Sequence, residues 1–150
     1  MKICVSTVAF STNNILVKEL QKNFSNVVVN EKGVRIVENE LADFYQDAEG
    51  IIVGLEKITP ELLDQLPKLK IIAKYGVGLD NIDVDECKKR NIQIGWTGGV
   101  NKRSVAEMAL GFMLALTRNL YLTSNQLKKG IWNKNGGFQL TGKTIGIIGV

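Results

Sequence analysis

A short turn at residues 76–78 carries the residue types best suited to chemistry. A run of β-branched residues ends at Tyr75, and Gly76, Val77 and Gly78 follow before an acidic segment starts the next helix. Two glycines around one residue let consecutive backbone N–H groups point into a common space, which suits a carboxylate or phosphate oxygen. Because such turns at the carboxyl ends of parallel strands bind ligands, we expect an anion site. The alternative is an ordinary strand-to-helix turn.

The last ten residues, TGKTIGIIGV, read as a polar turn followed by a β-branched strand that ends at Gly149. A glycine at this place opens the Gly-rich loop of dinucleotide-binding folds. The second and third glycines of that loop, and the helix whose N-terminus neutralises the phosphate, would follow Val150. We therefore expect residues 1–150 to carry only part of a binding machinery.

A third candidate site is the hydroxyl-rich loop after the first expected strand. Its side chains could cradle a phosphate, as in a free-standing flavodoxin-like module, or they could cap the next helix, which we favour. The residues are Ser6, Thr7, Ser11, Thr12 and Asn13.

Short apolar runs alternate with helical patterns along the chain. The runs are mostly continuous, as in strands buried on both faces. They predict strands at 2–8, 26–29, 50–55, 70–75, 91–95 and 144–148. Helices are predicted at about 13–23, 37–46, 60–66, 84–90 and 104–127. This alternation predicts an α/β fold, with a parallel sheet, right-handed crossovers and helices on both faces.

Three of the helices carry start signals. A capping side chain precedes a proline or stands three residues before a glutamate. The pairs are Thr59 with Pro60, Asp83 with Glu86, and Ser104 with Glu107. These common signals predict boundaries and say little about function.

The helix expected after Ser104 is apolar on two faces. Each large apolar side chain left in water would forgo about 1.5 to 3 kcal/mol. One stripe consists of Val105, Met108, Ala109, Phe112, Met113, Leu116 and Leu120, and a second of Leu110, Leu114 and Tyr121. We therefore expect another domain or a second subunit to cover this helix.

Composition indicates a globular protein. The 150 residues are 45% apolar and 23% charged, with two prolines. Cys4 and Cys87 form neither a disulfide framework nor a zinc pattern, which favours a reducing compartment. The N-terminus is too short and polar for a signal peptide, and no run reaches the roughly 18 apolar residues of a membrane span. We expect a soluble, cytoplasmic protein with no membrane partner and no metal.

The net charge of +4 is unevenly distributed. Between Lys102 and Lys143 there are seven basic residues and one acid, Glu107. A nucleic-acid surface is one use of such a stretch, but the aromatic interleaving and arginine density of a dedicated binder are absent. We favour a solvated helix face or the rim of an anion site, and expect no nucleic-acid partner.

Three ordered strings carry a family resemblance. They are YGVGLDNID at 75–83, NIQIGWTGGVNKRSVAEMALGFMLALTRNL at 91–120, and GFQLTGKTIGIIGV at 137–150, with Trp132 before the last. The chain closely resembles the N-terminal part of the D-isomer-specific 2-hydroxyacid dehydrogenases, including phosphoglycerate dehydrogenase-like members. The resemblance spans the whole chain and is strongest from Gly50 onward.

The resemblance implies a flavodoxin-like substrate domain, built from both chain ends, that faces a Rossmann NAD domain across a cleft. Residues 1–99 would be the N-terminal part of the substrate domain. Residues 100–150 would hold the dimerisation helix and the first strand of an incomplete NAD domain. The segment 96–101 resembles the interdomain hinge, and helix 104–121 resembles the family's homodimer contact.

Carried over to this chain, the resemblance implies that the Val77 and Gly78 amides, in the Tyr75–Gly78 turn, hold the carboxylate of a 2-oxo or 2-hydroxy acid. Asn101 would lie near the substrate, although a loop or helix-cap amide is the alternative. Val77 and Val105 would line the nicotinamide pocket, and Gly149 would open the pyrophosphate loop. The implied cofactor is NAD, with NADP left open.

The family's catalytic arginine, glutamate and histidine would lie after residue 150, and this chain has no histidine. Because hydride transfer to a carbonyl needs a proton donor near neutral pKa, residues 1–150 alone are expected to be inactive. Phosphoglycerate-specific members often have an arginine where this chain has Gly54. The hinge reads Thr97, Gly98 and Gly99 where many relatives have proline, which could loosen domain closure.

The sequence therefore predicts an oxidoreductase fragment, the substrate-binding and dimerising part of an NAD-dependent D-2-hydroxyacid dehydrogenase. Two alternatives belong to other classes. One is a corepressor-like relative that keeps the NAD site and binds peptides. The other is the free-standing flavodoxin-like module.

Overall fold

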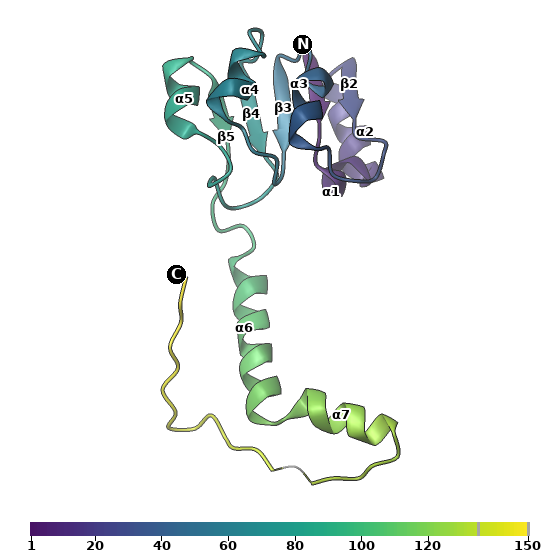
Figure 1. Cartoon of the computed structure of the whole chain (residues 1–150), viewed down its shortest axis with the longest axis vertical. Helices are drawn as coiled ribbons and strands as arrows, with labels where there is room; N and C mark the ends of the chain where they lie inside the picture. The colour runs from purple at the N-terminus through teal and green to yellow at the C-terminus, as the bar shows by residue number, and fades with distance from the viewer. Residues whose placement is uncertain (135, 150) are drawn as a thin grey trace. The chain divides into compact units, whose positions relative to one another are not determined.

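An all-parallel sheet organises the first half of the chain. The computed structural model describes residues 1–134 and 136–149 and divides the chain into two units, Met1–Gly99 and Val100–Val150 (Figure 1). The strands of the first unit are β1 (Lys2–Val5), β2 (Asn26–Val29), β3 (Gly50–Val53), β4 (Ile71–Lys74) and β5 (Gln93–Gly95). Their order is β2-β1-β3-β4-β5, so all carboxyl ends lie at one edge. The fold is the predicted flavodoxin-like α/β fold.

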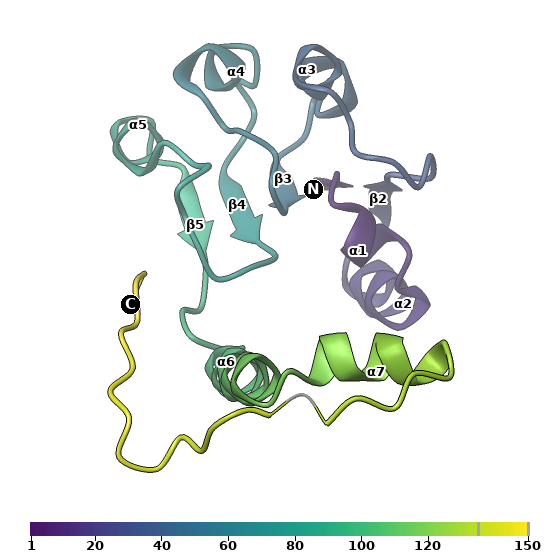
Figure 2. The same cartoon turned by 60° about the horizontal axis from the view of Figure 1, so that its bottom comes forward.

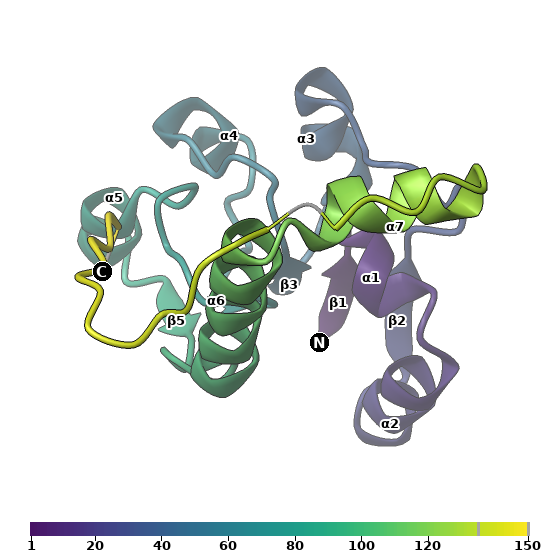
Figure 3. The ribbon, with the colours of Figure 1, turned by 90° about the horizontal axis from the view of Figure 1, so that it is seen from below.

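Helices cover both faces of this sheet. They are α1 (Val8–Ser11), α2 (Asn14–Asn23), the 3-10 turn η1 (Glu38–Glu40), α3 (Leu41–Phe44), α4 (Pro60–Asp64) and α5 (Val84–Lys89). Figures 2 and 3 show α1 and α2 on one face and α3, α4 and α5 on the other. This division follows from right-handed crossovers, because the path from β1 to β2 runs opposite to the later ones.

The main core lies between the sheet and α3, α4 and α5. Paired strand residues Ile51 and Ile72 are almost fully buried there, and Tyr45 fills the space beneath α3. Cys4 and Cys87 are free thiols in the same core, and burial raises the pKa of both. The continuous apolar runs of the sequence thus correspond to strands that contribute to a buried layer.

Several predicted boundaries in the first unit shift. The strand at 26–29 is confirmed, but β1 ends at Val5, since Val8 already begins α1. The helix predicted at 37–46 is only η1 followed by the single turn of α3. An apolar pattern marks what is buried and does not fix where a strand gives way to a helix, so the first strand was predicted too long.

Two of the three capping predictions are confirmed. Thr59 Oγ1 accepts the N–H of Leu62 at 3.3 Å, and Asp83 Oδ1 accepts the N–H of Glu86 at 2.9 Å. The prediction for Ser104 is wrong, because the helix already begins at Lys102. The capping position belongs to Asn101, whose side chain makes no cap hydrogen bond.

The second unit holds two helices, α6 (Lys102–Thr117) and α7 (Leu120–Lys128), where one helix was predicted at 104–127. Asn119 separates them with a φ of 52°, a left-handed conformation that asparagine tolerates better than most residues. The strand predicted at 144–148 is wrong, because these residues form no strand in the structure. A strand needs a neighbour for its backbone hydrogen bonds, and no other strand is described in this unit.

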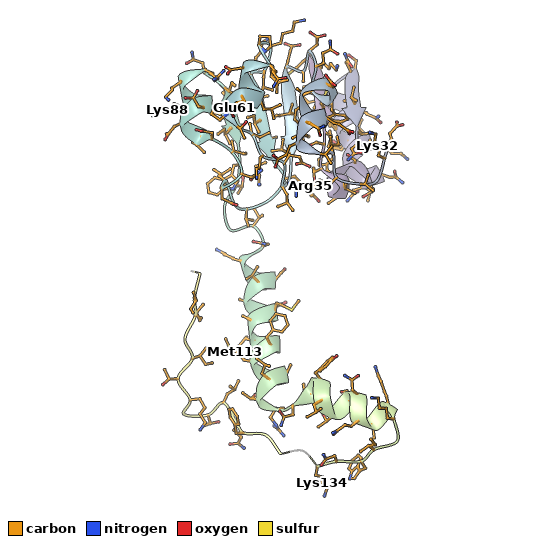
Figure 4. All side chains as sticks on the ribbon, in the orientation of Figure 1. Lys32, Arg35, Glu61, Lys88, Met113 and Lys134 are labelled. Carbon is orange, nitrogen blue, oxygen red and sulfur yellow. The ribbon has the colours of Figure 1, made fainter. Side chains whose placement is uncertain are left out.

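The apolar side chains of α6 are exposed within the chain. Met108 is 59% exposed, Phe112 61% and Leu116 76%. Met113, labelled in Figure 4, lies on the same helix and is partly buried. Among the described residues of this unit none is buried. The helix therefore gains little from packing within the chain, as its two apolar faces indicated.

One buried contact allows a test of the first unit. The Tyr45 hydroxyl donates to Ser6 Oγ at 2.6 Å, and both residues are completely buried. Tyr45→Phe should lower the free energy of unfolding by about 1–2 kcal/mol, because Ser6 loses a buried partner. Urea denaturation would measure this loss. The control Tyr121→Phe changes a residue that is 83% exposed and should stay within about 0.5 kcal/mol of the parent; equal losses would contradict the prediction.

Candidate functional site

The turn after β4 presents unused backbone donors. The N–H of Tyr75, just before it, donates to Val53 O at 2.8 Å, completing the strand pairing. The N–H groups of Gly76, Val77 and Gly78 donate no hydrogen bond to any group in residues 1–134 and 136–149. Unpaired backbone donors are kept only where water or a ligand reaches them. The turn predicted as an anion site thus has its donors free.

The turn at residues 76–78 is open to a small ligand. Gly76 and Val77 are exposed and Gly78 is partly exposed, so a ligand could reach them. Gly76 has a φ of 153°, a conformation that favours glycine. A Cβ on Gly78 would lie 2.6 Å from Asp80 Oδ1, so a side chain there would displace that carboxylate. The backbone conformation therefore favours glycine at position 76, whereas a side chain at position 78 would require only the exposed Asp80 side chain to move.

Lys74 places a positive charge beside the turn. Its Nζ lies 3.9 Å from the point that a Cβ on Gly76 would occupy. The ammonium donates to Gly54 O and Asn81 Oδ1, which ties the ends of β3 and β4 together. Burial lowers the pKa of Lys74, and the carboxylates of Asp80 and Glu56 oppose that shift. This cation favours the binding of an anion at the turn, whereas the Asp80 carboxylate beside Gly78 opposes it.

Glu56 completes the polar network at the end of β3. It is only 3% exposed, and its Oε2 accepts the N–H of Gly54 at 2.6 Å. Asn81 donates to the carbonyl groups of Gly54 and Glu56. A Cβ on Gly54 would meet Thr7 Oγ1 at 2.7 Å. The place where phosphoglycerate-specific relatives often have arginine therefore has no room for a side chain without rearrangement.

The hydroxyl-rich loop at residues 6–13 is engaged within the protein. Ser11 Oγ donates to Val5 O at 3.2 Å and Thr12 Oγ1 to Val8 O at 2.9 Å. Asn13 Oδ1 accepts two N–H groups at the start of α2. The favoured capping role is therefore confirmed at Asn13.

The remaining predicted site residues are described each in its own unit. Tyr75 packs its ring edge-to-face on Phe10, with centroids 5.5 Å apart. Asn101 caps α6 by position and is exposed, Val105 is 56% exposed, and Gly149 has a φ of 88°. The last three residues belong to the second unit, and their roles in binding stay predictions.

The sequence reading missed two residues that act on the turn. It named Lys74 only as part of a strand and Trp96 only as part of a hinge. Trp96 Nε1 donates to Val77 O at 2.9 Å. A lysine that ends an otherwise apolar strand was the one available signal, whereas nothing local in the sequence links Trp96 to Val77.

Two of the surface hollows described in the first unit bear on the choice of site. One of about 540 Å³ includes Leu55, Lys57 and Asp80 and borders the carboxyl edge of the sheet. A larger one of about 840 Å³ lies at β2 and α3 and includes none of the turn residues. The free donors and the cation, rather than hollow size, identify the candidate site.

The described part of the chain lacks two kinds of feature. No group of three or more histidine, cysteine, aspartate or glutamate residues there could hold a metal ion. None of the helices in those residues has the length and apolar character needed to cross a membrane.

A parallel flavodoxin-like sheet with free donors at its carboxyl edge defines an α/β domain of the class that places its ligand sites at this edge. Comparison with known proteins gives the family. The model for the D-isomer specific 2-hydroxyacid dehydrogenase catalytic domain matches residues 6–142. The chain belongs to this family.

Individual relatives support the assignment. Hydroxypyruvate reductase of Thermotoga maritima is 35% identical over 138 residues, which are 87% of this chain and 45% of that protein. Glyoxylate reductase of Thermococcus litoralis is 40% identical over 103 residues, covering 63% and 31%. The NAD+-bound 3-phosphoglycerate dehydrogenase structure of Entamoeba histolytica has a TM-score of 0.66 at 33% identity, covering 79% and 39%. The chain spans less than half the length of each.

The crowding at Gly54 can be tested by adding one methyl group. Gly54→Ala should lower the free energy of unfolding by about 1–3 kcal/mol, because the new Cβ overlaps the side chain of Thr7, which is only 7% exposed and has little room to move. The matched control is Gly95→Ala in β5, where the nearest atom would lie at an ordinary 3.9 Å. Thermal unfolding of both variants would measure the difference; a Gly54→Ala variant as stable as Gly95→Ala would contradict the crowding.

Proposed function

We propose that this chain is the substrate-binding part of an NAD-dependent D-2-hydroxyacid dehydrogenase, an oxidoreductase that acts on a CH–OH group. The observation that carries the proposal is the set of free N–H groups at Gly76–Gly78, beside Lys74, on the fold of this family. Such donors suit the carboxylate shared by 2-oxo and 2-hydroxy acids. NAD would accept or supply the hydride at the substrate's C2.

The roles of individual residues follow from their chemistry. The Val77 and Gly78 amides would hold the substrate carboxylate, and Asn101 would lie near the substrate. Val77 is 37% exposed and Val105 56% exposed, so each offers an apolar surface to a nicotinamide ring. Gly149 would open the pyrophosphate loop, and its φ of 88° is a conformation that favours glycine. The residues present thus fit the part of NAD binding proposed for them.

The substrate is proposed to be a small, unphosphorylated 2-oxo or 2-hydroxy acid. Gly54 supports this choice, because it offers no cationic side chain after β3 and has no room for one. The relatives named for hydroxypyruvate and glyoxylate act on acids of this size.

A homodimer through helix 104–121 is proposed to cover α6. The exposed Met108, Phe112 and Leu116 support it, because they offer a continuous apolar surface. The free thiols Cys4 and Cys87 support a reducing, cytoplasmic location. Residues 1–150 are proposed to bind substrate without turning it over, because they include no histidine to donate the proton.

The activity can be measured on the intact protein that contains this chain. It should consume NADH in the presence of glyoxylate or hydroxypyruvate and act more slowly on 3-phosphohydroxypyruvate, with kcat/KM compared across the three acids. Residues 1–150 alone, assayed in parallel, should be inactive. The proposal would be abandoned if no 2-oxo acid in the panel supported NADH consumption by the intact protein.

The charge beside the turn gives a binding prediction. Lys74→Met should weaken the binding of oxalate to the chain about five-fold, because a nearby cation is lost from a partly solvated anion site. Isothermal titration calorimetry would measure the affinity. The matched control is Lys70→Met, which removes the same charge just before the other end of β4, where Lys70 pairs with Glu49 at 2.6 Å. Equal weakening by both variants would show an effect of net charge only.

A further inference from the structure

Trp96 contacts the backbone of the turn at residues 76–78. It directly follows β5, and its indole N–H donates to the carbonyl oxygen of Val77 at 2.9 Å. The side chain is 46% exposed, so packing in the core does not explain its placement. The bond reaches the one residue of the turn that is flanked by glycines on both sides.

Through the peptide group between Val77 and Gly78, the Trp96 hydrogen bond affects the orientation of the Gly78 N–H. The Val77 carbonyl and the Gly78 N–H belong to one planar, trans peptide group and point to opposite sides of it. A donor that fixes the carbonyl therefore also fixes the direction of the Gly78 N–H. A hydrogen bond accepted by the carbonyl also polarises the peptide and strengthens its N–H as a donor.

The turn needs such a clamp because its own sequence does not restrain it. Gly76 and Gly78 have wide conformational freedom, so the peptide between Val77 and Gly78 could rotate and turn its N–H away. Tyr75 is held by Phe10 on one side, and the Ile82 N–H donates to Leu79 O on the other. Between these points, the Trp96 bond is the only one described to the turn's backbone in residues 76–78.

Gly98 provides the space that the indole occupies. A Cβ on Gly98 would lie 2.9 Å from Trp96 Cη2 and 3.0 Å from Cζ2, so the indole ring would have to move. Its φ is not in the left-handed region, so alanine there would act by pushing on the ring and not through backbone strain. Gly98 thus leaves the space in which the Trp96 indole reaches Val77.

We infer that Trp96 is a positioning residue for substrate binding, which holds the Val77–Gly78 peptide so that the Gly78 N–H faces the substrate carboxylate, and that Gly98 makes room for it. The inference rests on the proposed function and goes beyond it by naming what orients the anion donor.

The test follows backbone amides of the chain by ¹⁵N–¹H NMR during titration with sodium oxalate. In the parent, oxalate should shift the Gly78 and Val77 amides. Trp96→Phe keeps an aromatic ring and removes the indole donor. It should change the ¹⁵N shift of Gly78 in the free protein and weaken oxalate binding about three- to ten-fold, the loss expected for one hydrogen bond. Trp132→Phe is the control, because Trp132 is 75% exposed in the other unit.

A second variant separates positioning from general stability. Gly98→Ala keeps the indole but displaces it, so it should reproduce both effects, and the double variant should be no weaker than Trp96→Phe alone, as expected for residues that act together. Thermal midpoints should stay close to the parent in all variants, since Trp96 is exposed.

The outcomes are distinguishable. If the parent binds oxalate at Gly78 and Trp96→Phe binds it equally well with an unchanged Gly78 shift, the inference fails and the proposed function stands. If oxalate does not shift the Val77 and Gly78 amides of the parent, the proposed function fails, and this inference with it.

Discussion

The backbone N–H and C=O groups at the carboxyl edge of the sheet need hydrogen-bond partners, and the rest of the structure depends on how this need is met. Where parallel strands end, backbone groups lose their ladder partners and must find others. At the end of β3, the Glu56 carboxylate accepts a hydrogen bond from the Gly54 N–H. The side chains of Lys74 and Asn81 donate hydrogen bonds to the Gly54 carbonyl. At the end of β4, the N–H groups of residues 76–78 find no such partner among the described residues. The proposed binding surface is the part of this edge whose backbone N–H groups have no described acceptor.

Much of the fold could be predicted because its signals are local. The apolar run at 26–29 and the caps at Thr59 and Asp83 depend on residues within a few positions of each other. The break at Asn119 and the short α1 could not be predicted in this way, since neither interrupts the hydrophobic pattern. The run at 144–148 has strand composition, but composition supplies no neighbouring strand.

The candidate site also contains residues that the sequence predicted and residues that it did not. The Gly76–Gly78 turn follows from two glycines at the end of a strand, and the sequence was sufficient to place it. Lys74 and Trp96 act through bonds to carbonyl groups 20 and 19 positions earlier in the chain. Such bonds depend on which strands become neighbours and on where each one ends. Hydrophobic periodicity does not contain that information, so the residues that support the site emerged only from the structure.

The two buried thiols have a practical consequence. Cys4 lies in β1 and Cys87 in α5, both without measurable exposure and both with raised pKa. A thiolate is the form that alkylating reagents attack, so neither side chain reacts while the core is closed. Each becomes reactive only when its segment opens. The rate of alkylation at each cysteine therefore reports how often β1 and α5 open and expose their buried side chains.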